Sequence, residues 1–182
     1  DPDAHSQELS ELIPDILAED LSALVLFTSW RQMLRVFDDL DDNFRPLVLM
    51  QGDLSKHEIL KLHRKRIDAK EVSYIFGLSS FAEGVDLPGE YCRHVVIAKL
   101  PFSVPDDPVD ATLAEWINSR GGNSFYDLVL PNAALRVIQA AGRLLRTETD
   151  SGVVSILDRR LLTKSYGKVI LNALPPFRRE FH

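Results

Sequence analysis

The sequence predicts an α/β fold in which helices cover both faces of a mostly parallel sheet. Short, continuous apolar runs alternate with segments that have the helical spacing of about 3.6 residues. Most of the apolar runs lack regularly alternating polar side chains, so we expect strands that are buried on both faces. This alternation of strand and helix is typical of a three-layer α/β sandwich. The expected strands cover residues 23–27, 46–50, 71–77, 94–98 and 152–157.

Helical spacing fills the intervals between these strands. The first expected helix covers residues 8–19, after a ragged end over 1–5, and Pro14 caps or kinks its middle. Ser29 is placed to cap a second helix that runs to about Leu40. Pro131 lies near the start of a long helix, where proline is best tolerated. Further helices are expected at 55–67, 111–117 and 165–171, with turn-rich breaks at 105–108 and 121–123.

Length and composition indicate one ordinary globular domain. We expect it to cover residues 1–182, of which 1–20 are the N-terminal helix and ragged end. The net charge of −6 argues against a protein coated in basic charge for duplex binding, although a local basic groove remains possible. We find no apolar run of the length of a membrane span and no signal peptide. Because the chain begins at Asp1 without a methionine, we interpret it as a piece of a longer protein.

The single cysteine, Cys92, cannot form an internal disulfide. It also cannot by itself hold zinc or an iron–sulfur cluster, which need about four ligands. A reducing, cytoplasmic setting is therefore expected.

The most informative run is residues 137–146, which reads V-I-Q-A-A-G-R-L-L-R. Gln139, Arg143 and Arg146 fall at i, i+4 and i+7, so we expect them on one face of a helix whose opposite side is apolar. Guanidinium groups are well suited to binding phosphate and to stabilising charge on a transferring phosphoryl group. A solvated basic face is the alternative for any isolated Arg-x-x-Arg pair.

The loop after the first expected strand carries Thr28, Ser29 and Trp30. Hydroxyls and free backbone N–H groups at a helix start can hold a phosphate, and the indole can stack on a base. The alternative is an ordinary serine cap with a tryptophan packed under it.

A second loop, residues 77–89, follows the third expected strand. Ser79 and Ser80 can donate to a phosphate, and Asp86 can accept from a ribose hydroxyl. Gly84 lets the backbone approach a ligand closely or adopt a positive φ. The alternative is a solvated surface loop rich in turn residues, but its apolar members Phe81 and Val85 argue against it.

Two motifs of nucleotide hydrolysis are absent from the sequence. There is no G-x-x-x-x-G-K-S/T phosphate loop and no strand that ends in paired acids for magnesium. None of the histidines has metal-ligand spacing or an obvious nucleophile beside it. We therefore expect that this domain cannot hydrolyse a nucleotide alone and supplies the second half of a two-lobed motor.

In this order the loops resemble those of the second RecA-like motor domain of a superfamily 2 helicase. The similarity is greatest to the bacterial DinG helicases, relatives of the XPD group. Residues 27–30 resemble motif IV, residues 80–89 the motif V pattern S-F-x-E-G-V-D-x-P-G, and residues 139–146 motif VI. Residues 100–102, 158–161, 166–167 and 174–176 also resemble this family. The likeness runs from about Leu24 to the end of the chain.

The resemblance implies a RecA-like three-layer sandwich, the P-loop NTPase fold in a lobe that lacks the phosphate loop. It implies an ATP-dependent DNA helicase that moves 5′ to 3′ on single-stranded DNA and unwinds forks, D-loops and R-loops in repair and replication. ATP and Mg²⁺ would be shared with the first motor lobe of the same chain. That lobe would also carry a 4Fe–4S cluster.

The resemblance also assigns roles to residues. Arg146 would be the arginine finger, Arg143 would reach the phosphates or couple the lobes, and Gln139 would position the γ-phosphate or the attacking water. Three residues would form the nucleotide-sensing wall of the cleft: Glu83, Gly84 and Asp86. Five residues would grip single-stranded DNA: Thr28, Ser29, Trp30, Ser79 and Ser80.

The residues themselves leave other interpretations of the function open. A stand-alone nucleotide- or phosphate-binding regulatory α/β module would explain the loops, but not three polar groups on one helix without a phosphate loop. A degenerate structural lobe that docks other proteins would not need both Arg143 and Arg146. A nuclease or hydrolase lacks a supporting cluster of acids or histidines.

Overall fold

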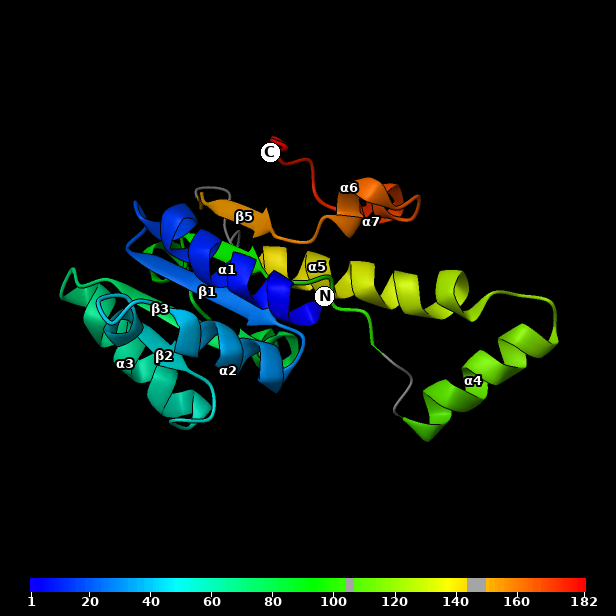
Figure 1. The fold of residues 1–182 in the computed structure, drawn as a ribbon, viewed down its shortest axis with the longest axis horizontal. Coiled ribbons are helices and arrows are strands. Elements are labelled where there is room, and N and C mark those ends of the chain that lie inside the picture. The colour runs from blue at the N-terminus through cyan, green and yellow to red at the C-terminus, as the bar shows by residue number, and fades with distance from the viewer. Residues whose placement is uncertain (104–106, 144–149) are drawn as a thin grey trace. The chain divides into compact units, whose positions relative to one another are not determined.

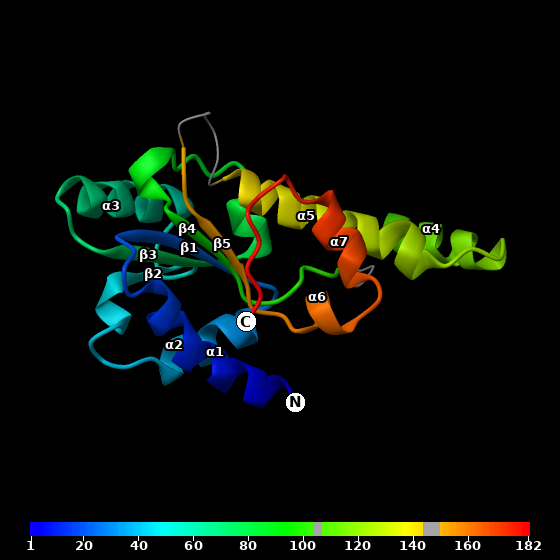
Figure 2. The same ribbon diagram turned by 90° about the horizontal axis from the view of Figure 1, so that it is seen from above.

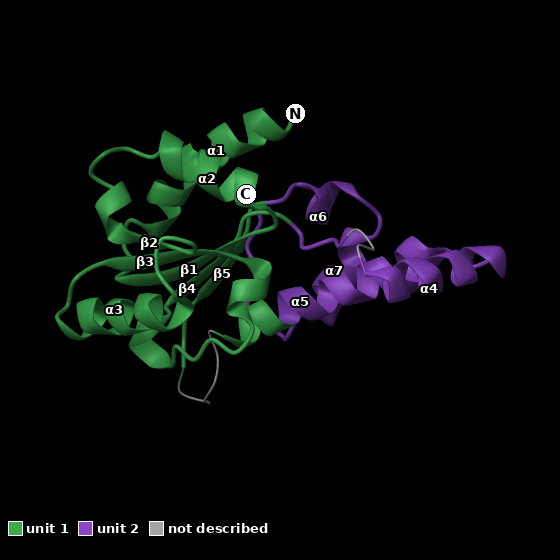
Figure 3. Ribbon diagram, turned by 90° about the horizontal axis from the view of Figure 1, so that it is seen from below, with its two compact units in different colours: residues 1–99, 139–157 green, residues 100–138, 158–182 purple. Residues whose placement is uncertain are grey.

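The computed structural model describes residues 1–103, 107–143 and 150–182 (Figure 1). The chain consists of two compact units (Figure 3). The first unit is residues 1–99 with 139–157, and the second is residues 100–138 with 158–182. Arg146, Leu145 and part of the turn predicted at 105–108 lie outside the described residues.

The first unit contains the sheet. Its helices are α1 (Pro2–Leu17), α2 (Trp30–Asp39) and α3 (Lys56–Asp68). Its strands are β1 (Ser22–Phe27), β2 (Val48–Met50), β3 (Ser73–Leu78), β4 (His94–Ile97) and β5 (Val153–Ile156). The second unit holds α4 (Pro108–Ser119), α6 (Arg160–Thr163), α7 (Gly167–Ala173) and most of α5 (Leu130–Gly142), whose last residues belong to the first unit.

The described strands form a five-stranded sheet in the order β2-β3-β1-β4-β5. Every pairing is parallel, as the unbroken apolar runs predicted. In the central strand, Leu24 pairs with Ile75 of β3 and with Val95 of β4. Helices α1 and α2 cover one face of this sheet, and α3 covers the other (Figure 2). The predicted three-layer arrangement is therefore confirmed.

A hydrophobic core lies between the sheet and α1 with α2. Alternate strand residues Val25, Phe27, Phe76 and Val96 pack there against helix residues such as Met33, all buried. The rings of Phe27 and Phe76 are tilted with their centroids 5.2 Å apart. Burial of each such side chain contributes about 1.5–3 kcal/mol relative to exposure, which fixes the strands in register.

Several element bounds differ from the predicted ones. Helix α1 begins at Pro2, within the segment predicted to be ragged, because the Asp1 carboxylate accepts from Asp3 N at 3.0 Å and caps it. Pro14 lies inside α1 without ending it. Strand β2 starts later than predicted, after a 3₁₀ turn over Arg45–Leu47. A π-helical turn, Phe125–Val129, precedes α5.

On the α3 side of the sheet, His63 is fully buried and joins three elements. Its Nε2 lies 2.7 Å from the Tyr91 carbonyl oxygen, and its Nδ1 lies 2.8 Å from Ser73 Oγ. The carbonyl can only accept, so Nε2 carries the proton and the Ser73 hydroxyl donates to Nδ1. Burial lowers the pKa of His63, and this effect exceeds that of the Tyr91 carbonyl, which raises it.

This buried histidine predicts a pH dependence of stability. Because its pKa is lower in the folded chain than the ordinary value near 6.5, the unfolded chain binds a proton first as pH falls. The free energy of unfolding should be highest above pH ~6.5 and should fall between pH ~6.5 and ~5, above the ordinary range of the carboxyl groups, by up to about 1.4 kcal/mol per pH unit. Urea unfolding at a series of pH values measures this slope. His63→Gln should remove it, whereas His57→Gln, on the exposed face of the same helix, should keep it. An unchanged slope in His63→Gln would contradict the assignment.

Candidate functional site

The carboxyl ends of β1, β2 and β3 bring the two predicted loops together. Phe27, the last residue of β1, pairs with Leu78, the last residue of β3. The Ser79 hydroxyl, directly after β3, donates to the Phe27 carbonyl at 3.2 Å. Gln51, directly after β2, accepts from the Leu78 N–H through its side-chain oxygen at 2.8 Å. In open parallel sheets this edge is where ligands bind.

The loop after β1 fits parts of both interpretations of its residues, an ordinary serine cap and a surface that can bind a base. Ser29 is the N-cap of α2 and accepts from Gln32 N at 3.2 Å. Trp30 is 45% exposed. Its ring lies against Gly52, where a Cβ would come 3.2 Å from Trp30 Cζ3. The hydroxyl of Ser29 is thus used for capping, while part of the indole surface remains accessible to a base.

The loop after β3 has an apolar underside and a polar outer side. It begins with a 3₁₀ turn over Ser79–Ala82, and Phe81, Val85 and Leu87 are buried. Glu83, Gly84 and Asp86 are exposed between them. Gly84 has φ +70°, the left-handed region that favours glycine. The burial of Phe81 and Val85 agrees with the expectation that this is not merely a solvated loop.

Three cations hold backbone carbonyls of this loop. Lys56 Nζ donates to the Glu83 carbonyl and also lies 5.1 Å from the Phe81 ring centroid. Arg143 Nη1 donates to the Val85 carbonyl at 3.2 Å. Arg64 Nη2 donates to the Asp86 carbonyl. The exposed acids therefore sit on a segment whose backbone is tied to α3 and to the end of α5.

The arginine helix is α5 together with the end of the run at residues 137–146, and the structure describes it as far as Arg143. Gln139 is exposed, while Ala140 and Ala141 are buried, so the helix presents a polar side and an apolar side as predicted. Arg143 is half-buried, and its Nε is buried with no hydrogen-bond partner among the described residues. Taking an N–H out of water without an acceptor is unfavourable, so the bond to the Val85 carbonyl and the packing of this guanidinium must compensate for it. Arg146 lies outside the described residues, so its place relative to Arg143 stays a prediction.

The sequence did not identify Lys56 and Arg64 as members of this site. Both belong to a predicted charged helix with several lysines and arginines, and helical spacing does not tell which of them face the loop. Their position eight residues apart, about two turns, is consistent with a shared side of α3.

The second unit has its own ion pair, in which the acid is buried. Asp158 is 8% exposed, accepts from Leu100 N at 2.9 Å, and accepts from Arg160 Nη2 at 2.6 Å. Burial raises the pKa of Asp158, but the hydrogen bonds from Arg160 and Leu100 outweigh it and hold the pKa below its ordinary value. The Arg160 guanidinium lies over the Phe102 ring, 5.2 Å from its centroid. These contacts join residues 100–102 to the segment after β5, two segments that the sequence singled out.

No metal centre is apparent in the parts of the chain that the structure describes, since no three His, Cys, Asp or Glu side chains cluster there. Cys92 is buried, and burial raises the pKa of its thiol to about 12. One buried, protonated thiol does not fit a 4Fe–4S cluster, which needs about four thiolates. Within the same ranges, no helix combines the length and apolar character needed to cross a bilayer.

Comparison with solved structures identifies the class of fold. An XPD helicase aligns with 94% of this chain at a TM-score of 0.72 and 21% identity, and the match covers 31% of that helicase. Domain 2 of the DEAD-box helicase Mss116p, solved with an RNA duplex, aligns with 97% of this chain at a TM-score of 0.50 and 13% identity. The fold is that of a RecA-like helicase domain.

Sequence comparison identifies the family. Residues 15–177 match the family described as the helicase C-terminal domain, so the chain belongs to this family. It is 42% identical to the ATP-dependent DNA helicase DinG of Photobacterium profundum over 97% of its own length. It is 45% identical to DinG of Escherichia coli over 86% of its length. The chain spans 26% and 22% of these two relatives, so it corresponds to their C-terminal helicase domain.

Proposed function

We propose that this chain is the second motor lobe of an ATP-dependent DNA helicase that moves 5′ to 3′ and acts in DNA repair and replication. One observation carries the proposal: Arg143, at the end of α5, meets the loop of Glu83 and Asp86 in a domain whose sequence has no phosphate loop. Such a lobe completes a nucleotide site that another lobe begins. The DinG relatives, named ATP-dependent DNA helicases, support the same function.

In this function the arginine helix faces the nucleotide. Arg146 acts as the arginine finger, and Arg143 reaches the phosphates from the end of α5. Gln139, exposed on the same helix, positions the γ-phosphate or the attacking water. Preorganised guanidinium groups stabilise the charge of a transferring phosphoryl group at little cost of reorganisation. Glu83, Gly84 and Asp86 form the adjoining wall of the cleft.

Single-stranded DNA would lie across the loops after β1 and β3. The backbone N–H groups at the start of α2 and the Ser80 hydroxyl contact phosphates, and Trp30 stacks on a base. The Ser79 hydroxyl donates to the carbonyl of Phe27, the residue before Thr28, and keeps the two loops together. Closing and opening of the cleft between the lobes would then move the DNA-binding loops of this lobe relative to those of the first lobe. This movement would unwind forks, D-loops and R-loops.

The remaining partners belong to the first motor lobe. ATP binds between the lobes, and the phosphate loop and magnesium ligands come from the first lobe of the longer chain. The resemblance to DinG helicases implies a 4Fe–4S cluster in that lobe, and the residues present here do not fit one. We also propose a cytoplasmic location, since the one cysteine is a buried free thiol.

The direct test is ATP turnover by the longer protein with and without single-stranded DNA. We expect strong stimulation by DNA, and no turnover by residues 1–182 alone. Absence of stimulation in the longer protein would contradict the motor. Micromolar nucleotide binding by residues 1–182 alone would instead favour a regulatory nucleotide-binding module.

A further inference from the structure

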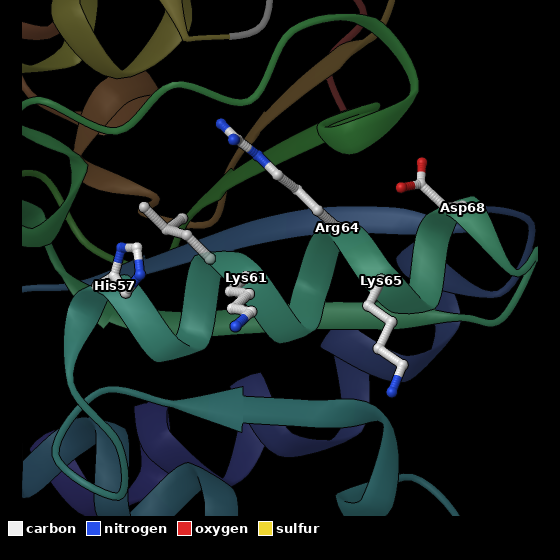
Figure 4. A pocket seen from close by; sticks show the side chains of 6 residues that line it. His57, Lys61, Arg64, Lys65 and Asp68 are labelled. Carbon is white, nitrogen blue, oxygen red and sulfur yellow. The ribbon is translucent and has the colours of Figure 1, made fainter.

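The cations of α3 fall into two groups that point in different directions. Figure 4 shows Lys61 and Lys65 projecting from one side of the helix and Arg64 from the other. Lys61 and Lys65 are exposed, whereas Arg64 is half-buried. The first two therefore fit a solvated basic face, and Arg64 does not.

Arg64 makes specific contacts with the loop and its surroundings. Its Nη2 donates to the Asp86 carbonyl, and its guanidinium lies over the Tyr91 ring, 5.7 Å from the centroid. Its Nε is buried and has no hydrogen-bond partner in the described parts of the chain. Taking an N–H out of water without an acceptor is unfavourable, so the other contacts must compensate for it. A side chain that served only solubility would keep this atom in water.

The loop needs such support because it has little regular structure of its own. Between the 3₁₀ turns Ser79–Ala82 and Gly89–Tyr91, no helix or strand includes its residues. Arg143 and Arg64 bind adjacent carbonyls, those of Val85 and Asp86. In the proposed function Arg143 must leave the Val85 carbonyl when it turns to phosphate. Arg64 has no such second role, so its bond can persist through that exchange.

We propose that Arg64 is a positioning residue for nucleotide binding, which holds the Glu83–Asp86 segment in place while Arg143 changes partner. Lys56, on the Glu83 carbonyl, supports the other end of the segment. Arg64 acts through the loop and does not itself touch the nucleotide. This inference rests on the proposed motor function.

The test uses the longer protein, with ATP and single-stranded DNA as probes. Arg64→Met removes the donors and the charge but keeps an aliphatic stem of similar reach. Lys65→Met removes the same charge from the next residue, which contributes no contact to the loop among those the structure describes. We expect Arg64→Met to raise KM for ATP by about tenfold, the typical effect of losing one charged hydrogen bond. Lys65→Met should change KM by less than about twofold.

Two further measurements separate positioning from folding and from the motor itself. Arg64→Lys, which restores a cation and a donor, should recover most of the lost affinity for ATP, and the thermal midpoint of Arg64→Met should match that of Lys65→Met. Equal KM values for ATP in Arg64→Met and Lys65→Met would overturn this inference but would leave the proposed motor function standing. A lower thermal midpoint with unchanged KM would show a structural role only. If the wild-type protein has no DNA-stimulated turnover, the motor function fails, and this inference fails with it.

Discussion

Replacing Arg146 by alanine in the longer protein is expected to lower DNA-stimulated ATP turnover by about 10³-fold or more. Arginine fingers contribute roughly 10³ to 10⁵ in rate in the GTPase systems where they are measured. The assignment rests on its place three residues after Arg143 in the Q-x-x-G-R-x-x-R run. Affinity for single-stranded DNA, measured without nucleotide, should remain close to that of the wild type, because the proposed DNA contacts lie on other loops.

Arg136→Ala is the matched control for this variant. Arg136 is an exposed arginine of α5 that precedes the motif, and its removal changes the charge by the same amount. We expect near-normal turnover in the control. Near-normal turnover in Arg146→Ala would refute the role of arginine finger, and loss of DNA binding would mean that the residue belongs to the grip instead.

The second large effect is expected for stability. Gly167 starts α7, and a Cβ at this position would lie 1.9 Å from the Leu161 carbonyl oxygen. Because the clashing atom is backbone, the clash cannot be relieved by a change of rotamer. Gly167→Ala should therefore cost about 3 kcal/mol or more of the free energy of unfolding, at the upper end of overpacking effects.

Chemical denaturation of residues 1–182 measures this cost, and a second glycine-to-alanine variant serves as the control. Gly142 lies in α5, and nothing would come within 4 Å of a Cβ added there. Gly142→Ala should be neutral or stabilise the chain by up to about 1 kcal/mol, because alanine favours helix. If both variants unfold alike, the close packing of α7 on Leu161 is not required for stability.

The sequence was sufficient to predict the layers of the fold and the edge that carries the site. Runs such as residues 23–27 are apolar throughout, which favours strands that are covered on both faces. The structure pairs Phe27 with Leu78, so the loops that begin at Thr28 and Ser79 leave the same edge of the sheet. Gln139 and Arg143 could be placed on one polar side of a helix because that relation depends on helical geometry alone.

Local pattern was less informative where an element's end depends on a single contact. The start of α1 at Pro2 depends on the Asp1 carboxylate, which the sequence left in a ragged end. The late start of β2 depends on the 3₁₀ turn around Pro46. In both cases the end of the element depends on a local contact, the Asp1 cap or the 3₁₀ turn, which the apolar pattern of the sequence does not reveal.

Tertiary structure alone decided which polar side chains work together over long separations. Arg64 and Lys65 are adjacent cations in the sequence, yet one binds the Asp86 carbonyl and the other is exposed. Asp158 reaches Leu100 N across 58 residues of chain. The sequence determined the periodicities, and through them the parallel sheet, the two loops and the arginine helix. The partners of the buried cations and acids depend on where distant backbone carbonyls and N–H groups come to lie, and only the packed fold fixes those positions.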